Sequence, residues 1–504
     1  MLPPDVASAD CRMNPVGGTR TARTRAAGWH GSGCSPLGHV FKLPQPLPDA
    51  HPSPAEGDHP AVEFFVTEAI DLLIHARWTV PVEPAGTVLD NHSIAVHDGR
   101  IVATLPRSEA LTRFRATRQV ELAEHVLIPG LVNLHTHAAM SLMRGLADDL
   151  PLMRWLQDAI WPAEGRHISP AFVRDGTLLA AAEMLRGGIT TCSDMYFYPE
   201  SAAAAFAEAG MRAVLGLVML EFPTSYASDA DDCLRKGLAA RERWLGHPLI
   251  SFSIAPHAPY TVSDTSFIRA RALADELRLP LHVHIHETAD EIRNALATDG
   301  QRPLARLARL GLLGENFIGV HAVQIDENDI ELLSRYNCSI AHCPTSNMKL
   351  ASGITPVPRL LDAGLRVGLG TDGAASNNRL DLFQEMRHAA LLAKVGTLDA
   401  TAVPAHTALR MATLAGAQAL GLDASIGSIT PGKQADLCAI RLGDLESRPC
   451  FDPVSHLVYV AGREYVTHVW VNGESRVDKG VPLLHINDSE LLRAVSVWQT
   501  KIVN

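Results

Sequence analysis

The stretch Leu127-Ile-Pro-Gly-Leu-Val-Asn-Leu-His135-Thr-His137 decides how the rest of this chain is interpreted. An apolar run ends there in two histidines that are separated by one residue. Successive side chains of an extended strand point to opposite faces, so His135 and His137 should emerge on the same side. Two imidazoles on one face can bind one divalent metal from a rigid support, although two polar residues closing a strand would give the same pattern. The other ligands must therefore be sought further along the chain.

The composition describes an enzyme-sized globular protein. The chain has 504 residues, of which 47% are hydrophobic and 20% charged, so it can bury a large core in one large domain with an appendage or in two to three domains. A net charge of -11 argues against nucleic acid as the main partner. No stretch approaches the ~20 apolar residues of a membrane helix. The eight cysteines are scattered without a CxxC pair, which favours reduced thiols in the cytoplasm. We therefore expect a cytoplasmic homo-oligomer without nucleic-acid or membrane partners.

Residues 1–58 differ from everything that follows them. They are rich in Pro, Gly, Ser, Arg and His and have no periodic apolar pattern, so we expect this extension to be disordered. It lacks the apolar core of a secretory signal. A mis-assigned start codon explains the extension as well as a functional tail does.

Both ends of the remaining chain show short strand-like runs. Asp98-Gly99 and Asn472-Gly473 each lie between apolar runs, where a tight hairpin turn is expected. We predict that residues 59–126 and 416–480 together form one small β-sandwich domain, and that residues 481–504 form a C-terminal helical segment.

The middle of the chain, residues 127–415, alternates strand-like and helix-like segments. Helices are expected at Phe172–Arg186, Ala202–Ala209, Ile268–Arg278 and Asp329–Arg335. Eight strands are expected, ending at His135–His137, Asp194, Leu220, His257, His286, His321, His342 and Asp372. This alternation predicts an α/β fold, a parallel (β/α)8 TIM-type barrel whose chemistry collects at the carboxyl ends of the strands.

Polar side chains follow several of these strand ends. The fifth strand carries His282, His284 and His286 on one face, followed by Glu287. His284 and Glu287 form an H-x-x-E pair, which supplies a metal ligand and an acid that can move protons, whereas we interpret His282 and His286 as supporting or packing residues. His321 ends the sixth strand. Asp372 ends the eighth strand within Gly370-Thr-Asp-Gly373, where a carboxylate can bind a metal or hold a water.

In their order, these motifs resemble the amidohydrolase superfamily, in the branch of purine and triazine deaminases and chlorohydrolases. The resemblance covers about residues 62–475 and rests on P-G-L-V-N-L-H-T-H, H-x-x-E, G-V-H and L-G-T-D-G-A-A-S-N-N. Arg144-Gly-Leu-Ala-Asp-Asp-Leu, Trp155 and His342-Cys-Pro-Thr-Ser-Asn-Met-Lys-Leu350 most resemble the deaminases of 5′-methylthioadenosine and S-adenosylhomocysteine.

The resemblance implies one catalytic divalent metal in each subunit. Its ligands would be His135, His137, His284 and Asp372, and this set suits zinc first, with ferrous iron as the alternative. The metal would convert a water to hydroxide near neutral pH. By resemblance, His321 and Asp372 orient that water, Asp372 accepts its proton, and Glu287 protonates the adenine ring while the amino group leaves as ammonia.

The resemblance also implies a small-molecule nucleoside substrate. Asp148 aligns with the acidic residue that binds the ribose, although related enzymes often have Glu there, and His257 matches a histidine that contacts the substrate. Glu287 and Asp372 would contact the substrate as well. Trp155 and Met140 could line an apolar thioether pocket, but core packing would also explain either of them. No arginine after the third strand matches those that some relatives use for a charged substrate tail, which weakens the case for S-adenosylhomocysteine.

Several alternatives stay open at this point. The same scaffold could deaminate guanine, 8-oxoguanine or cytosine, or hydrolyse chloro-triazines. A two-metal centre is disfavoured because the fourth strand contains no lysine. A non-catalytic binding protein is disfavoured because every expected ligand and Glu287 are present.

Overall fold

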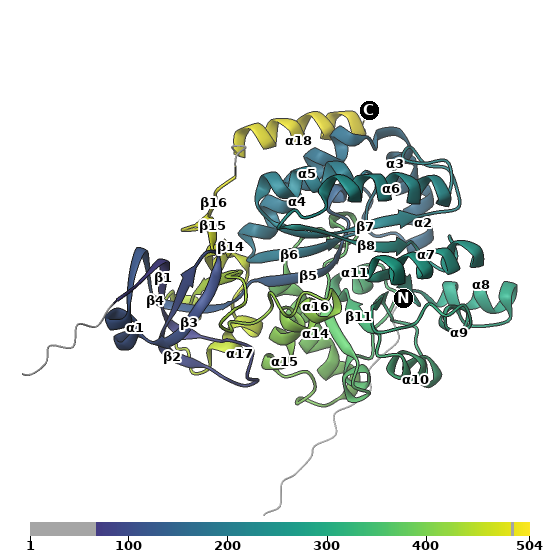
Figure 1. Ribbon diagram of the computed structural model, residues 1–504. Helices are drawn as coiled ribbons and strands as arrows, with labels where there is room; N and C mark the ends of the chain where they lie inside the picture. Colours follow the sequence, from purple (N-terminus) through teal and green to yellow (C-terminus); the bar gives the residue numbers. More distant parts are fainter. Residues whose placement is uncertain (1–66, 485–487, 504) are drawn as a thin grey trace, which may run out of the picture. The chain divides into compact units, whose positions relative to one another are not determined.

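A computed structural model describes residues 67–484 and 488–503, and these belong to one compact unit that spans Phe64–Asn504. The predicted disordered extension, residues 1–58, lies outside the described residues. The middle of the chain forms one sheet of eight parallel strands in the order β12-β11-β10-β9-β8-β7-β6-β5. The strands are β5 (Leu131–Thr136), β6 (Ile189–Asp194), β7 (Arg212–Met219), β8 (Ile250–Pro256), β9 (Leu281–Ile285), β10 (Phe317–His321), β11 (Ser339–His342) and β12 (Arg366–Leu369). The predicted (β/α)8 barrel is confirmed (Figure 1).

Side chains close the barrel where the first and last strands meet. The Asn133 side chain on β5 donates to the Thr371 hydroxyl at 2.8 Å and accepts from the Thr371 backbone N–H at 2.9 Å. One residue further, the Asp372 backbone N–H donates to the His135 carbonyl at 3.0 Å. This seam places the chain segments of His135 and Asp372 side by side.

Helices follow the strands and begin at polar caps. Ser169, Asp229, Ser263, Thr288 and Asp381 each accept a hydrogen bond from a backbone N–H in the first turn of the helix that follows. The α-helices are α1 (Arg107–Arg113), α2 (Leu152–Trp155), α3 (Trp161–His167), α4 (Pro170–Arg186), α5 (Pro199–Ala209), α6 (Ala230–Trp244), α7 (Asp264–Leu277), α8 (Ala289–Asp299), α9 (Pro303–Arg309), α10 (Glu327–Arg335), α11 (Pro344–Lys349), α12 (Val357–Asp362), α13 (Ala374–Asn377), α14 (Leu382–Thr397), α15 (Ala405–Met411), α16 (Leu414–Ala419), α17 (Pro453–Tyr459) and α18 (Asp488–Val503). Short helical turns are η1 (Ala138–Met143), η2 (Leu156–Ile160, a π-helix), η3 (Leu445–Ser447) and η4 (Arg463–Tyr465).

Both ends of the described chain together build a second structure, as predicted, and in place of the expected β-sandwich the strands are arranged as one mixed sheet. Its order is β16-β15-β14-β13-β4-β1-β2-β3, so strands from the two ends meet where β13 pairs with β4 (Figure 1). The strands are β1 (Glu68–Thr79), β2 (Leu89–His97), β3 (Arg100–Pro106), β4 (Phe114–Pro129), β13 (Leu437–Arg441), β14 (Val466–Val471), β15 (Glu474–Asp478) and β16 (Val481–Pro482). Only β1 and β4 pair in parallel, so the sheet is mixed.

The two predicted hairpin turns are confirmed. Asp98-Gly99 joins β2 to β3 with φ angles of 48° and 72°, and Asn472-Gly473 joins β14 to β15 with φ angles of 53° and 77°. Two consecutive positive φ values are those of a type I′ turn, which Asp-Gly and Asn-Gly adopt at low cost.

The second sheet is tied to the amino-terminal ends of the barrel strands. Arg212, at the start of β7, donates from Nε to the Asp436 carboxylate at 3.0 Å, and Asp436 also accepts from the Asn472 backbone N–H at 2.7 Å. The C-terminal helix α18 packs on α4, where the Trp498 indole donates to Asp175 at 2.8 Å (Figure 1). The second sheet therefore contacts the amino-terminal ends of the barrel strands, and the functional site lies at their carboxyl ends. None of the described helices is both long and apolar enough to cross a membrane.

Candidate metal centre and active site

The two histidines that open the barrel converge on one carboxylate. His135 lies on β5, and His137 follows it at the start of η1. Their Nε2 atoms lie 3.5 Å and 3.3 Å from Oδ1 of Asp372. The seam between the first and last strands therefore brings together residues that are more than two hundred positions apart.

A third imidazole completes the cluster. Nε2 of His284, on β9, lies 3.2 Å from Nε2 of His135. Donor atoms that are each about 2.0–2.1 Å from a tetrahedral zinc lie about 3.3 Å from one another. The spacings of 3.2, 3.3 and 3.5 Å therefore suit a divalent cation beside His135, whose donor atom is shared by two groups, one with His284 and the other with His137 and Asp372. His321 lies beside them, since one of its nitrogens is within 4.8 Å of donors on His135 and His284.

Hydrogen bonds fix the outward nitrogen of each clustered ring. Nδ1 of His137 bonds the Met195 carbonyl at 2.5 Å, and Nδ1 of His284 bonds the His257 carbonyl at 2.8 Å. A carbonyl can only accept, so both Nδ1 atoms carry a proton, and it is Nε2 of each ring that faces the centre and can bind a cation there. Such outer contacts are those that orient metal-binding histidines.

The outward nitrogen of His135 is held by another histidine. Its Nδ1 lies 3.2 Å from Nε2 of His282, and Nδ1 of His282 lies 3.1 Å from the Ser193 hydroxyl. His282 thus has the supporting place that we expected. His286 turns away from the centre, because its Nε2 accepts from the Leu304 backbone N–H at 3.0 Å.

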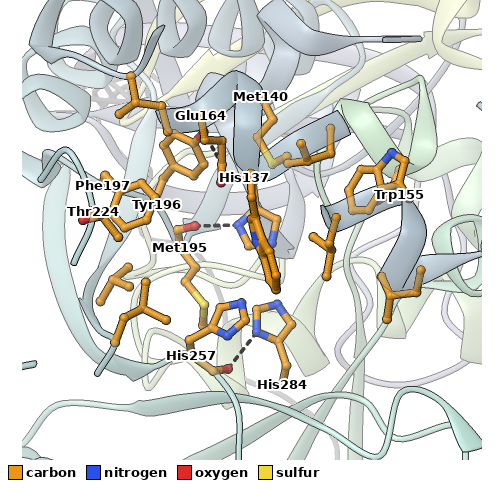
Figure 2. Close-up of a pocket in the computed structure, with 18 of the residues that line it drawn as sticks. His137, Met140, Trp155, Glu164, Met195, Tyr196, Phe197, Thr224, His257 and His284 are labelled. Carbon is orange, nitrogen blue, oxygen red and sulfur yellow. Dashed lines mark hydrogen bonds between the residues drawn. The ribbon is translucent and has the colours of Figure 1, made fainter. Parts of the chain in front are cut away.

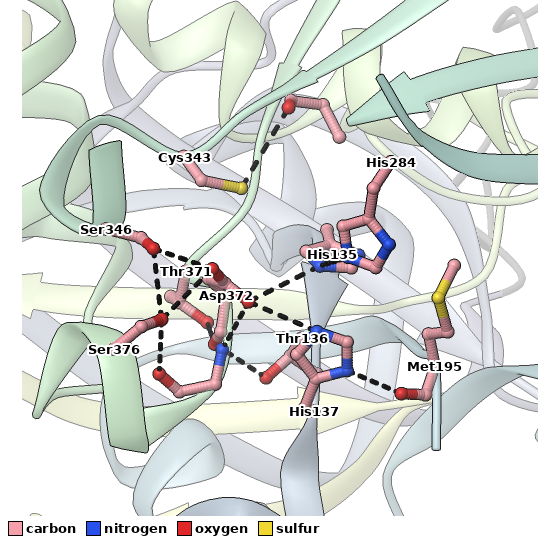
Figure 3. A network of polar contacts seen from close by, with 12 residues as sticks. His135, Thr136, His137, Met195, His284, Cys343, Ser346, Thr371, Asp372 and Ser376 are labelled. Carbon is pink, nitrogen blue, oxygen red and sulfur yellow. Dashed lines mark hydrogen bonds and ion pairs between the residues drawn. The ribbon is translucent and has the colours of Figure 1, made fainter. Parts of the chain in front are cut away.

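The Asp372 carboxylate is held from behind by hydroxyl groups. Its Oδ2 accepts from Ser346 at 2.6 Å and from Ser376 at 3.0 Å, and its Oδ1 accepts from the Gly373 N–H at 2.8 Å (Figure 3). The backbone of Asp372 has a φ of 61°, an uncommon conformation that its surroundings must enforce. Together these contacts turn Oδ1 towards the histidines.

Electrostatics also favour a cation at this place. Burial lowers the pKa of His135 to about 4 and that of His284 well below its usual value, so both rings are neutral at pH 7. Burial lowers the pKa of His137 too, but the hydrogen bond and charge of Asp372 outweigh burial and raise it to about 9. A cation between His137 and Asp372 takes the place of that proton.

Glu287 lies beside the cluster and is suited to move protons. Burial raises the pKa of its carboxyl group to about 7, which His321 partly opposes and Asp372 reinforces. Oε2 of Glu287 lies 3.8 Å from Nε2 of His321, whose Nδ1 bonds Oδ1 of Asn347 at 2.9 Å. A carboxyl group that titrates near neutral pH can both donate and accept a proton.

The cluster forms the inner end of a cavity of about 370 Å³. Figure 2 shows His137, His257 and His284 gathered at one end, with Tyr196 and Phe197 on one side and Trp155 on the other. The side walls are mainly apolar and include Met140, Trp155, Leu156, Ile160, Trp161, Val218, Leu220 and Phe222. Of the described residues that line the cavity, none is a lysine or an arginine.

Of the two residues expected to contact the substrate from outside the metal cluster, His257 lines the cavity and Asp148 does not. His257 lines the cavity, its Nδ1 bonds the Thr261 hydroxyl at 2.9 Å, and burial lowers its pKa to about 3, so the ring is neutral. Asp148 is not among the described residues that line the cavity. Its carboxylate instead bonds Nζ of Lys349 at 2.5 Å and Nδ2 of Asn378 at 3.0 Å. Asp148 thus joins loops of the chain outside the cavity.

Glu164 is a third acidic residue in the cavity wall, beside Glu287 and Asp372, and sequence reasoning missed it. It lies on α3, accepts from the Tyr196 hydroxyl at 2.7 Å, and has a pKa that burial raises to about 7. The only signal in the sequence is an acidic residue within the aromatic stretch Trp161-Pro-Ala-Glu164. The side chain of Glu164 faces the cavity because the π-helical turn η2 sets the rotation of α3, and no residue pattern in the sequence indicates that turn.

The fold and this site define a metal-dependent hydrolase built on a (β/α)8 barrel. A sequence profile of the Amidohydrolase family matches residues 126–476. The chain belongs to this family, which confirms the expected family and the expected class of enzyme, a hydrolase acting on C–N bonds.

Individual relatives are similar over nearly their whole length. A 5-methylthioadenosine/S-adenosylhomocysteine deaminase of Saccharophagus degradans is 47% identical over 86% of this chain and 97% of its own. The enzyme of the same name from Teredinibacter turnerae is 44% identical over 86% and 98%. The solved structure of an adenosine deaminase from Xanthomonas campestris with bound zinc has a TM-score of 0.85 and 48% identity, and it covers 87% of this chain and 99% of that one.

More distant structures share the fold alone. An atrazine chlorohydrolase from Arthrobacter aurescens has a TM-score of 0.78 at 21% identity, over 85% of this chain and all of its own. The E. coli guanine deaminase has a TM-score of 0.73 at 23% identity. The family membership, the zinc-bound relative and the His–Asp cluster together support a divalent metal as the cofactor.

Proposed function

We propose that this protein deaminates adenosine thioethers, with 5′-methylthioadenosine as the preferred substrate. The products are the inosine analogue and ammonia. One observation carries the proposal: Glu287, a buried carboxyl group with a pKa of about 7, lies beside a cluster of imidazoles and a carboxylate in the wall of an apolar cavity. The high identity to enzymes named 5-methylthioadenosine/S-adenosylhomocysteine deaminase supports the choice of substrate.

We infer that His135, His137, His284 and Asp372 hold one metal, and that zinc rather than ferrous iron is that metal. The choice of zinc is supported by its presence in the Xanthomonas relative. When bound there, the cation supplies a Lewis acid that lowers the pKa of a water from ~15.7 towards ~7.

The residues of the chain then supply proton transfer. Asp372 takes the proton of the attacking water, and the hydroxyl groups of Ser346 and Ser376 hold its carboxylate in place for that step. Glu287 donates a proton to the ring nitrogen next to the carbon that bears the amino group. His321 orients the water, because its Nδ1 is held by Asn347 and its Nε2 faces Glu287. Asp372 then returns its proton to the amino group, and the tetrahedral carbon expels it as ammonia.

The ribose and the 5′ group would lie along the cavity wall. We propose that Glu164, rather than Asp148, accepts hydrogen bonds from the ribose hydroxyls, because only Glu164 lines the cavity. His257 would contact the substrate from the opposite side (Figure 2). Trp155, Leu156 and Ile160 offer an apolar surface for a methylthio group.

The apolar wall also sets the expected specificity. The homocysteine tail of S-adenosylhomocysteine carries a carboxylate, and burying it without a cationic partner costs several kcal/mol. We therefore expect kcat/KM for 5′-methylthioadenosine to exceed that for S-adenosylhomocysteine by at least about tenfold, or about 1.4 kcal/mol.

Ammonia release by the purified, zinc-loaded protein tests this proposal. 5′-Methylthioadenosine, S-adenosylhomocysteine, adenosine and guanine are supplied separately, and kcat/KM is compared. A strong chelator should abolish the activity and added zinc should restore it. A protein with a full complement of zinc that releases no ammonia from any of the four would exclude the proposed reaction. The expected homo-oligomer and cytoplasmic location stay predictions, which light scattering and cell fractionation would check.

A further inference from the structure

A buried carboxyl group with no part in the proposed chemistry lies behind the site. Glu385, in the first turn of α14, is completely buried and does not line the cavity. Burial raises the pKa of its carboxyl group to about 8. A buried acidic side chain is costly unless its oxygens are bonded, so its partners indicate what it does.

Each oxygen of Glu385 binds a different connection after a barrel strand, one containing the short helix α11 and the other the short helix α13; both connections are called loops below. Oε2 accepts from the Thr345 backbone N–H at 3.0 Å, in the segment after β11. Oε1 accepts from Nδ2 of Asn377 at 2.9 Å, in the segment after β12. The Asn377 amide also donates to the Thr371 carbonyl at 2.6 Å, directly before Asp372. One carboxyl group therefore links two loops that follow neighbouring barrel strands.

These two loops carry the hydroxyl groups that hold Asp372. Ser346 follows Thr345, and Ser376 precedes Asn377, so each serine is the chain neighbour of a residue bound by Glu385. Both serines donate to Oδ2 of Asp372, and their hydroxyls lie 3.0 Å apart (Figure 3). The distance between the loops decides whether both hydroxyls reach the same oxygen.

We propose that Glu385 is a positioning residue that holds the two loops at the separation at which Ser346 and Ser376 together orient Asp372. The inference rests on the proposed role of Asp372 in metal binding and proton transfer. Loss of one Glu385 contact frees one loop, one serine leaves Oδ2, and Oδ1 turns from the histidines. Glu385 then acts through Asp372 without touching substrate or metal.

Glu385→Gln is the direct test. The glutamine oxygen can still accept a hydrogen bond from either Thr345 or Asn377, but its NH2 group faces the remaining donor and cannot accept from it. We expect the affinity for zinc, measured by competition with a chromogenic chelator in the absence of substrate, to fall about 10- to 100-fold. We expect kcat to fall by a similar factor while KM stays within about twofold. Glu385→Asp, which keeps the carboxyl group but shortens its reach, should show losses of the same kind.

A double-mutant cycle separates positioning from general destabilisation. In a protein that carries Ser346→Ala and Ser376→Ala, the further change Glu385→Gln should lower zinc affinity by less than about twofold, because the groups through which it acts are gone. The matched control is Asp436→Asn, since Asp436 is also buried and bonded to Arg212 and Asn472, but at the other end of the barrel. It should lower the thermal midpoint without changing zinc affinity.

Two outcomes would overturn the proposal. The first is a folded Glu385→Gln protein, or Glu385→Asp if the glutamine variant does not fold, with unchanged zinc affinity and kcat. The second is that Glu385→Gln lowers zinc affinity by the same factor in the wild-type protein and in the protein that carries Ser346→Ala and Ser376→Ala. The zinc measurement uses no substrate, so it stands even if the protein fails to release ammonia and the proposed reaction is wrong.

Discussion

Replacing Glu287 by glutamine tests the proton-transfer step most directly. Glutamine keeps the size and polarity of the side chain but cannot give up a proton. A carboxyl group placed for proton transfer contributes ~10²–10⁴ in rate, so we expect kcat of Glu287→Gln to fall by that factor. Zinc affinity should stay within about threefold, since Glu287 belongs to neither of the two groups of donor atoms around His135.

The pKa of Glu287 predicts how activity and stability depend on pH. The group must be protonated to act as an acid, so kcat/KM should fall as pH rises through about 7. Its pKa is raised from 4.5 to about 7 by folding, so the folded state holds a proton that the unfolded state has released between these values. Its contribution to stability is therefore present below pH 4.5 and is lost as pH rises through about 7. At 1.36 kcal/mol per pH unit, that loss is about 3 kcal/mol.

Rates across pH 5–9 and denaturant unfolding at pH 5 and pH 8 measure both effects. Glu287→Gln cannot lose a proton, so the difference in unfolding free energy between the two pH values should shrink by up to about 3 kcal/mol. The loss of kcat should be accompanied by unchanged zinc content. The reasoning is refuted if the glutamine variant keeps more than about a tenth of the wild-type kcat with zinc bound.

Other substitutions test separate parts of the site. Above pH 7, where the Glu164 carboxylate is ionised, Glu164→Gln should raise KM at least about tenfold, since a hydrogen bond to a charged group is worth ~1.5–3 kcal/mol. Asp148→Asn should leave KM within about twofold. A larger effect at Asp148 than at Glu164 would show that Asp148 makes the ribose contact. His282→Gln should weaken zinc binding ~10- to 100-fold in a chelator titration, and an unchanged affinity would show that the His135 ring is oriented without it. Asn133→Ala should lower the unfolding free energy by about 1–3 kcal/mol, because it leaves the Thr371 N–H buried without its partner; a loss below about 0.5 kcal/mol in denaturant unfolding would mean that the seam does not depend on this amide.

Much of the fold could be predicted because its signals are local. The eight strands and the helices between them follow from apolar periodicity and polar caps, and Asp98-Gly99 and Asn472-Gly473 each require the tight turn that they form. The residues of the centre follow from their positions at strand ends, because every parallel strand of a barrel delivers its carboxyl end to the same face. His135, His137, His284 and Asp372 come together for that reason.

Other features depend on contacts between distant segments. Asp148 and Glu164 are both acidic and both follow β5, but only the turn of η2 and the pairing with Lys349 decide which of them faces the cavity. The bonds of Glu385 to two loops have no trace in the sequence, because they join residues that only the barrel makes neighbours.

The sequence by itself determined the barrel and the family and predicted the donor atoms of the centre, since each depends on residue type and on position along a strand. The tertiary structure alone decided which carboxyl groups face the substrate cavity and which support it from behind. Direction and burial are set by the packing of whole segments, and the same carboxyl group is a ligand, an acid or a loop anchor according to what surrounds it.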